Sequence, residues 1–105
     1  MSRDEIPPGT LHLLILNTLA RDGELHGFEI AEAIERHSDD VLTVEEGSLY
    51  PALQRMQLKG WVSSEWGQTP TNRRARYYTL SATGRRQLAQ FNRVTGAIVR
   101  VLQTG

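Results

Sequence analysis

Cysteine is absent from this chain of 105 residues, and its absence excludes several kinds of protein. Disulfide-stapled scaffolds, thiolate metal sites and enzymes with a cysteine nucleophile all need that residue. A chain without cysteine also fits a reducing compartment. The three histidines, His12, His26 and His37, share no spacing typical of metal ligands. We therefore expect no metal ion and no cofactor.

Long apolar runs and catalytic motifs are also lacking. The longest aliphatic run, Leu13–Leu16, is far shorter than the roughly 20 residues that cross a bilayer. Residues 1–9 are mostly polar, contain two prolines and lack the apolar segment of a signal peptide. No glycine-rich phosphate loop and no convincing Ser-His-Asp set is found, so no catalytic residue is assigned. These absences favour a cytoplasmic protein that does not contact a membrane and is not an enzyme.

The net charge is zero, but the charges are unevenly distributed along the chain. Residues 1–50 have a net charge of −8, from eleven acidic and three basic residues. Residues 51–105 have a net charge of +8, from nine basic residues and Glu65. Neutrality alone argues against a nucleic-acid-binding domain, which is usually basic. The asymmetry between the halves, however, indicates a local basic binding surface.

A chain of this length has room for one domain, residues 1–105. Apolar periodicity predicts a first helix over residues 10–21, capped by Thr10 and ended by Gly23, and a second helix over residues 25–37. The first helix is apolar on nearly all sides, so more than one of its faces should be buried. His26 is expected to cap the second helix or to pack at its start.

A third helix is predicted over residues 46–59, and Pro51 decides where it starts. The capping-box spacing of Thr43 and Glu46 would start it early and place Pro51 in mid-helix, where a hydrogen bond is lost. With Ser48 as N-cap, Pro51 lies in the first turn, where proline is tolerated. We therefore expect a turn first and the main helix from Ser48. The apolar contacts of this helix should come from Leu49, Leu53, Met56 and Leu58.

After Gly60 the pattern changes to that of a β-hairpin. Residues 61–66 and 76–80 are rich in aromatic and β-branched side chains, and residues 67–75 between them are turn formers. The predicted hairpin has a long polar tip with three arginines, Arg73, Arg74 and Arg76. Core or interface positions are expected for Trp61, Trp66 and one of the pair Tyr77 and Tyr78.

Ser81 is expected to cap a last helix that runs to Gln103. Within it, residues at alternating steps of three and four form a pattern that resembles a heptad seam. The seam consists of Leu88, Phe91, Thr95, Ile98 and Leu102, with Val94 and Val101 beside it.

Three helices, a hairpin and a last helix predict a mainly α fold with a small β-hairpin (α+β). This is the order of a winged helix-turn-helix over residues 10–80 with an appended helix over 81–103. In that fold helix 48–59 enters the major groove of DNA and hairpin 61–80 forms a wing. Arginine and glutamine can pair with guanine and adenine edges, whereas serine, tyrosine and lysine more often hold phosphates. The candidate DNA contacts are Ser48, Tyr50, Gln54, Arg55, Lys59, Arg73, Arg74 and Arg76.

Two other interpretations of these residues stay open. A polar helix face is often only solvated surface, and arginines at a hairpin tip also deter edge-to-edge aggregation. A winged helix could instead bind an acidic protein partner without DNA, because fold does not fix function. The hydrogen-bonding helix face favours DNA, since a protein interface would present aromatic anchors there.

Four stretches, in this order and spacing, make residues 9–102 resemble the PadR family of bacterial transcriptional regulators. The most specific is EGSLYPALQRM at residues 46–56. The others are GTL with LLIL at 9–16, HGFEI at 26–30 and RYYTLSATG at 76–84. Gln57 and Phe28 depart from the acid and the tyrosine that the family commonly has at those positions.

The resemblance implies a homodimeric repressor that binds a palindromic operator in double-stranded DNA. It also implies that the last helix forms the dimer, commonly packed against the first helix of the partner. The residues expected at that interface are Leu11, Leu14, Ile15, Leu88, Phe91, Val94, Ile98 and Leu102. Some relatives bind flat aromatic molecules near the interface, in certain cases on a tryptophan of the last helix. Residues 81–105 contain no tryptophan, so a small-molecule effector at the dimer interface stays an open possibility.

Overall fold

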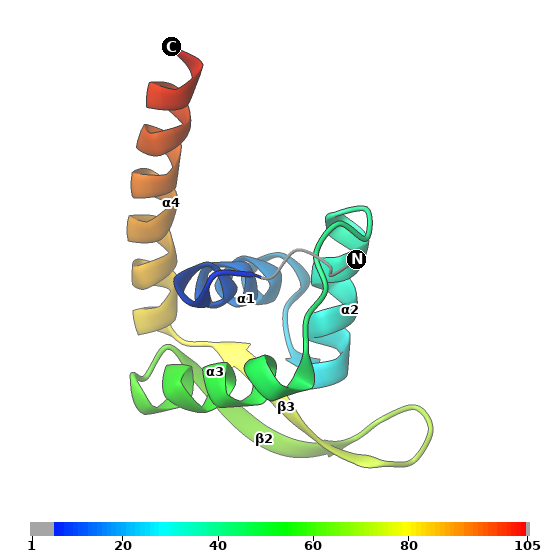
Figure 1. Cartoon of the computed structure of the whole chain (residues 1–105). Coiled ribbons are helices and arrows are strands. Elements are labelled where there is room, and N and C mark those ends of the chain that lie inside the picture. The colour runs from blue at the N-terminus through cyan, green and yellow to red at the C-terminus, as the bar shows by residue number, and fades with distance from the viewer. Residues whose placement is uncertain (1–5, 105) are drawn as a thin grey trace.

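The structure, a computed structural model, describes residues 6–104 and confirms the predicted α+β class. Its elements follow in the order α1 (Pro8–Asp22), β1 (Leu25–His26), α2 (Gly27–His37), α3 (Glu46–Leu58), β2 (Val62–Gln68), β3 (Arg74–Leu80) and α4 (Ala82–Gln103). Most of the polar N-terminal stretch, residues 1–5, lies outside the described range. Figure 1 shows α3 and the sheet at one end of the molecule and α4 extending away from them. No helix within residues 6–104 is both long and apolar enough to cross a membrane.

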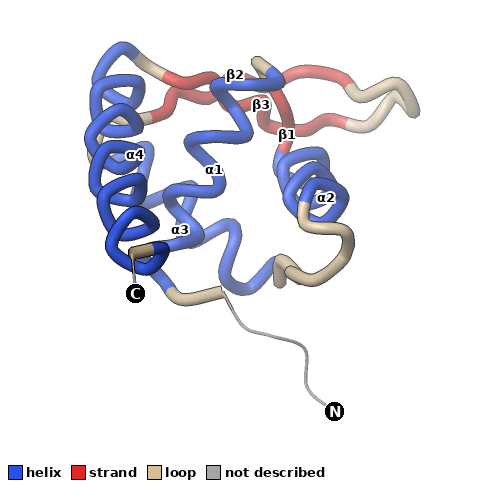
Figure 2. The backbone as a smooth tube through the Cα atoms, turned by 90° about the horizontal axis from the view of Figure 1, so that it is seen from above, coloured by secondary structure: helices blue, strands red, loops and turns tan. Residues whose placement is uncertain are grey.

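The apolar helix α1 lies at the centre of the fold. Leu11, Ile15, Leu16 and Leu19 are buried, and α1 contacts α2, α3, α4 and β3. Figure 2 shows α1 between α4 and α2. Neighbouring elements of the same chain cover several faces of α1. This explains why the helix is apolar on nearly all sides without a second copy of the protein. Leu11 and Ile15, two of the residues expected at a dimer interface, have almost no surface left for a partner.

Both ends of α1 follow from the backbone preferences of proline and glycine. Pro7 is the N-cap and Pro8 the first helical residue, so the prediction that Thr10 caps the helix is wrong. The amide of Thr10 already donates to the Pro7 carbonyl at 2.9 Å, because proline fits the first turn of a helix and starts it earlier. Gly23, with a φ of +82°, ends α1 as predicted.

The segment before α2 is a short strand rather than the start of a helix. Leu25 and His26 form β1 and pair antiparallel with Tyr78 and Tyr77 of β3, so the sheet has three strands instead of the two predicted. His26 then caps α2, as predicted. Its Nδ1 accepts from the amide of Glu29 at 3.4 Å, and Glu29 Oε1 accepts from the amide of His26 at 3.1 Å. This capping box fixes the junction between the sheet and α2.

Helix α3 starts two residues before the predicted N-cap. Glu45 is its N-cap, and the amide of Ser48 donates to the Glu45 carbonyl at 3.0 Å, so Ser48 lies inside the first turn. Pro51 therefore lies inside the helix, where its missing N–H leaves the Gly47 carbonyl without an intrahelical partner. Both residues are exposed, so that carbonyl stays open to water. Water can therefore replace the hydrogen bond lost at Pro51, so the helix can start at Glu46.

One predicted core position of α3 is wrong. Leu49, Leu53 and Met56 are buried as expected, together with Ala52. Leu58 is 82% exposed. It lies outside the buried face because helical periodicity rotates it away from the other three apolar residues.

The two strands of the hairpin are longer, and the tip between them shorter, than the pattern predicted. Strands β2 and β3 pair in register from Val62↔Leu80 to Gln68↔Arg74, which leaves only residues 69–73 for the turn. The amide of Thr69 donates to the Arg73 carbonyl at 2.8 Å and closes that turn. Of the three arginines predicted at the tip, only Arg73 lies there. Arg74 and Arg76 lie on β3, because the ladder continues past the aromatic segment.

Hydrogen bonds join the start of α4 to the connection between α3 and β2. Ser81 caps α4 as predicted, its Oγ accepting from the Gly84 amide at 2.9 Å. The amide of Ser81 donates to the Trp61 carbonyl at 3.0 Å. A Cβ at Gly84 would overlap that carbonyl oxygen, so the close approach requires glycine. Leu88 then continues the core, whereas the C-terminal half of α4 is largely exposed.

We predict that two glycine-to-alanine changes in α4 have opposite effects on stability. Gly84→Ala should lower the free energy of unfolding by about 1–3 kcal/mol or more, because the methyl group meets backbone that cannot move aside. Gly96→Ala should raise it by up to about 1 kcal/mol, because only the end of the Arg100 side chain lies within 4 Å. Denaturant unfolding of the two variants and the wild type measures both. Equal effects would contradict the close contact at Gly84.

Candidate nucleic-acid interface

The solvent-facing side of α3 carries the hydrogen-bonding side chains that the sequence indicated. Helical periodicity places Gln54 and Leu58 opposite the buried residues, at the middle of this face. The expected contact residues in this region are all exposed: Ser48, Tyr50, Gln54, Arg55 and, just beyond the helix, Lys59. None of these side chains is used to build the core, so the whole face is accessible to a partner.

Tyr50 lies on the flank of α3 that faces α2. A Cβ at Gly27 would come within 2.8 Å of both the ring and the hydroxyl oxygen of Tyr50. Glycine at the start of α2 therefore leaves the space that the tyrosine ring occupies. Because Gly27 itself is buried, this contact fixes the ring at the surface between α2 and α3.

The other flank of α3 faces α1 and carries positive charge. Burial lowers the pKa of His12 on α1, and the positive charges of Arg55 and Lys59 lower it further. The Nζ atom of Lys59 also lies 5.2 Å from the centroid of the Trp61 ring. The two flanks of α3 are thus different, one aromatic and one cationic.

The wing, which we define as β2, β3 and the turn between them, presents an arginine pair on a tryptophan. The Cζ atoms of Arg74 and Arg76 lie 4.7 and 4.9 Å from the centroid of the Trp66 ring. Trp66 pairs with Arg76 across the ladder, so all three side chains share one face of the wing. Trp66 is 57% exposed, so it does not lie in the core, which was one of the two positions expected for it. The ring instead holds two guanidinium groups near the surface.

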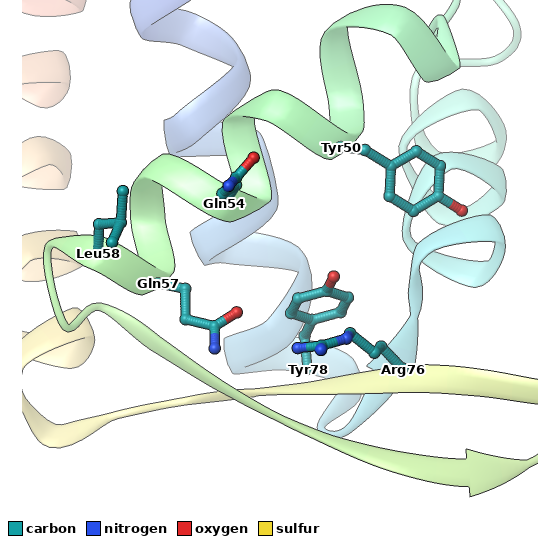
Figure 3. Close-up of a pocket in the computed structure, with 6 residues that line it drawn as sticks. All are labelled: Tyr50, Gln54, Gln57, Leu58, Arg76 and Tyr78. Atoms are coloured by element: carbon teal, nitrogen blue, oxygen red, sulfur yellow. The ribbon is translucent and has the colours of Figure 1, made fainter.

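A groove of about 400 Å³ separates α3 from the wing. Its lining residues are Tyr50, Gln54, Gln57, Leu58, Arg76 and Tyr78 (Figure 3). A chain of hydrogen bonds crosses it: Arg76 Nη1 donates to Ser64 Oγ at 3.0 Å, and Ser64 Oγ donates to Gln57 Oε1 at 3.3 Å. In Figure 3, Gln57 and Arg76 point toward each other from opposite walls. These two hydrogen bonds orient the Arg76 side chain toward α3.

Part of the positive charge of the second half of the sequence lies in α3, the wing and the connection between them. Residues 48–80 contain five basic residues and one acidic residue, a net charge of +4. Two acidic residues of α2 have structural partners instead: Glu29 caps its own helix, and Glu35 Oε2 accepts from the Val44 amide at 3.0 Å. These two carboxylates of α2 therefore stabilise the backbone by accepting hydrogen bonds from its amides.

Sequence reasoning missed three features of the site. To predict that Arg74 and Arg76 stack on Trp66, the register between the two strands must be known. A longer alternation of apolar and polar residues in the strands would have indicated that register. The hydrogen bonds that link Gln57, Ser64 and Arg76 join residues from three elements. No pattern in any one stretch of the sequence indicates them. The exposure of Leu58 had a signal, because its five-residue step from Leu53 breaks the three- and four-residue spacing of a buried face.

The fold and the exposed helix beside a basic hairpin define a winged helix-turn-helix regulator. A family model described as the transcriptional regulator PadR-like family matches residues 15–90. The chain therefore belongs to the PadR-like family of transcriptional regulators, as the sequence resemblance indicated. Members of this family are transcription factors and not enzymes.

Individual relatives agree with this assignment. The transcriptional regulator Rv3488 of Mycobacterium tuberculosis is 30% identical over 86 residues, which are 82% of this chain and 77% of the relative. A PadR family regulator from Clostridium difficile has a TM-score of 0.78 and 27% identity, and the match covers 90% of this chain and 95% of that one. Bacillus subtilis PadR, solved in complex with operator DNA, has a TM-score of 0.69 and 25% identity, over 81% of this chain and 48% of that one.

His12 lies where α1, the start of the wing and α4 meet. Its ring is edge-on to Trp61 at 6.1 Å, and Trp61 is edge-on to Phe91 of α4 at 6.0 Å. The Nε2 atom of His12 is buried and has no hydrogen-bond partner among the described residues. Burial is the main cause that lowers its pKa below 6.5, and the nearby cations add to it.

We predict that His12 makes the protein less stable in mild acid. A histidine with a lowered pKa in the folded state binds more protons when unfolded. The free energy of unfolding should therefore fall as the pH drops below about 6.5 and through the folded-state pKa. His12→Gln should show a smaller decrease than the wild type between about pH 7.5 and 5.5. His37→Gln is the control, because it removes an exposed imidazole and keeps the His12 contribution. Unfolding curves across that range measure the effect, and identical decreases in wild type and His12→Gln would contradict it.

Proposed function

We propose that this protein binds operator DNA sequence-specifically, with α3 in the major groove and the wing against the DNA backbone. One observation carries the proposal: the hydrogen-bonding face of α3 and the arginine-bearing face of the wing line the two walls of one groove. The Bacillus subtilis PadR complex with operator DNA supports it by analogy. A DNA strand passing through the groove would meet the glutamines of α3 on one wall and Arg76 of the wing on the other.

The arrangement suggests a division of roles among the exposed residues. Gln54 lies at the middle of the α3 face, where base edges are nearest, and a glutamine can pair with adenine N6 and N7. Arg55 and Lys59 on one flank, with Arg74 and Arg76 on the wing, suit phosphate contacts. Tyr50 on the other flank presents a hydroxyl that can donate to a phosphate. Base reading is thus assigned to the middle of α3 and positioning to its edges.

The regulator is proposed to act as a homodimer. The C-terminal half of α4 exposes a row of apolar side chains, with Ile98 54% and Leu102 74% exposed, and Val94 and Val101 also on the surface. The part of α4 that contains Leu88 packs against the chain's own core. A second copy covering the exposed row would bury it, and its two-fold symmetry would make the operator palindromic. As a dimer bound over a promoter, the protein would act as a repressor.

In vitro selection of DNA from a random library at about 150 mM salt tests the proposed function. We expect an inverted repeat whose half-sites lie about one helical turn, or a multiple of it, apart. That spacing would also report the geometry of the dimer. Failure to enrich any sequence would contradict sequence-specific binding.

We predict different losses from the middle of α3 and from the wing. Gln54→Ala should cost about 1–3 kcal/mol of binding and relax the preference at one position of the site. Arg73→Ala should weaken binding to all sequences alike and lower the salt slope by about one unit, because it removes one phosphate contact. Titrations of the enriched duplex and of single-base variants at several salt concentrations separate the two. A uniform loss from Gln54→Ala would contradict its role as a base reader.

Ile98→Glu should convert the protein into a monomer. An unpaired charge in an apolar seam is expensive to desolvate, so the dissociation constant of the dimer should rise roughly a hundredfold or more. The control is Gln103→Glu, which adds the same charge on another face of α4. Sedimentation equilibrium measures both masses. A wild type that is monomeric at every concentration would contradict the dimer.

A further inference from the structure

Leu58 is the most exposed large apolar side chain in the described part of the chain, with 82% of its surface accessible. It lies at the end of α3, four residues after Gln54, and therefore on the same face of the helix. Both side chains line the groove between α3 and the wing (Figure 3). An aliphatic group thus stands in the middle of the surface that the proposed function assigns to base reading.

The neighbours of Leu58 in this groove are mainly polar. Gln54 and Gln57 are the lining residues nearest to Leu58, whereas Arg76, Tyr78 and Tyr50 lie farther along the groove, toward the sheet and α2 (Figure 3). A protein-binding surface would surround an exposed leucine with further apolar anchors. Leu58 instead stands singly among hydrogen-bonding groups, which matches the mixed polar and methyl surface of a DNA major groove.

We infer that Leu58 contacts the C5-methyl group of a thymine in the operator and so determines specificity for that base. The methyl of thymine is the apolar group that unmodified base pairs present in the major groove. Contact between it and the leucine removes apolar surface of both molecules from water. The inference rests on the proposed function, because it requires α3 to lie in the major groove.

The geometry of α3 also limits where that thymine lies. Four residues of helix rise about 6 Å, and successive base pairs are about 3.4 Å apart. The thymine should therefore lie within about two base pairs of the position read by Gln54. The base that Leu58 contacts is thus specified both as a thymine and by its place in the half-site.

The test replaces thymine by deoxyuridine, which lacks only the methyl group. The probe is the duplex enriched by in vitro selection, made with each thymine replaced in turn and in both half-sites. Wild-type affinity should fall about three- to fivefold at one position in each half-site and little elsewhere. Leu58→Ala should bind the thymine and deoxyuridine duplexes equally well, and Leu58→Met should keep part of the difference.

The matched control is Val41→Ala, which shortens another exposed aliphatic side chain, in the connection between α2 and α3. It should retain the full difference between thymine and deoxyuridine. Sensitivity to deoxyuridine that is unchanged in Leu58→Ala would overturn the inference, as would its absence at every position in the wild type. Both results would leave the proposed function intact, since the unmodified duplex still binds. Failure to enrich any duplex would overturn the proposed function and the inference together.

Discussion

Burial of α1 is the constraint on which the rest of the structure depends. Ile15 and Leu16 are fully buried and Leu19 nearly so, and each such side chain contributes about 1.5–3 kcal/mol relative to exposure. Because α2, α3, α4 and β3 all contact this one helix, it sets their positions relative to one another. A helix that is apolar on nearly all sides is thus the scaffold on which the polar face of α3 and the wing are held, one beside the other.

The second constraint is the junction at Trp61, which couples the wing to α4. The Trp61 carbonyl receives the amide of Ser81, and Gly84 lets α4 approach it closely. The same tryptophan contacts His12 of α1 and Phe91 of α4 through its ring. The surface proposed for DNA and the helix proposed for dimerisation are therefore joined through a few rigid contacts. A dimer formed by α4 would hold two wings and two α3 helices at a fixed spacing, as a palindromic operator requires.

Much of this architecture could be predicted from the sequence, because most elements have strong local signals. The period of α1, the Ser81 cap and the aromatic strands gave the order of elements, and the motif around residues 46–56 indicated the family. Contacts between distant elements left weaker signals. Strand β1 is too short to show an alternating pattern, and the two arginines on Trp66 depend on a strand register that composition does not reveal. Leu58 was wrongly predicted to be buried because the prediction relied on its apolar side chain and not on its position around the helix.

The central claim is that a chain with zero net charge binds DNA through one locally basic face, formed by α3 and the wing. A map of the backbone amides that change on DNA binding tests it most directly. On adding the enriched duplex, we predict the largest resonance changes at residues 46–60 and 69–76, and little change around Glu32 and Arg36 on the outer side of α2. Changes concentrated on α2, with α3 and the wing unaffected, would contradict the account.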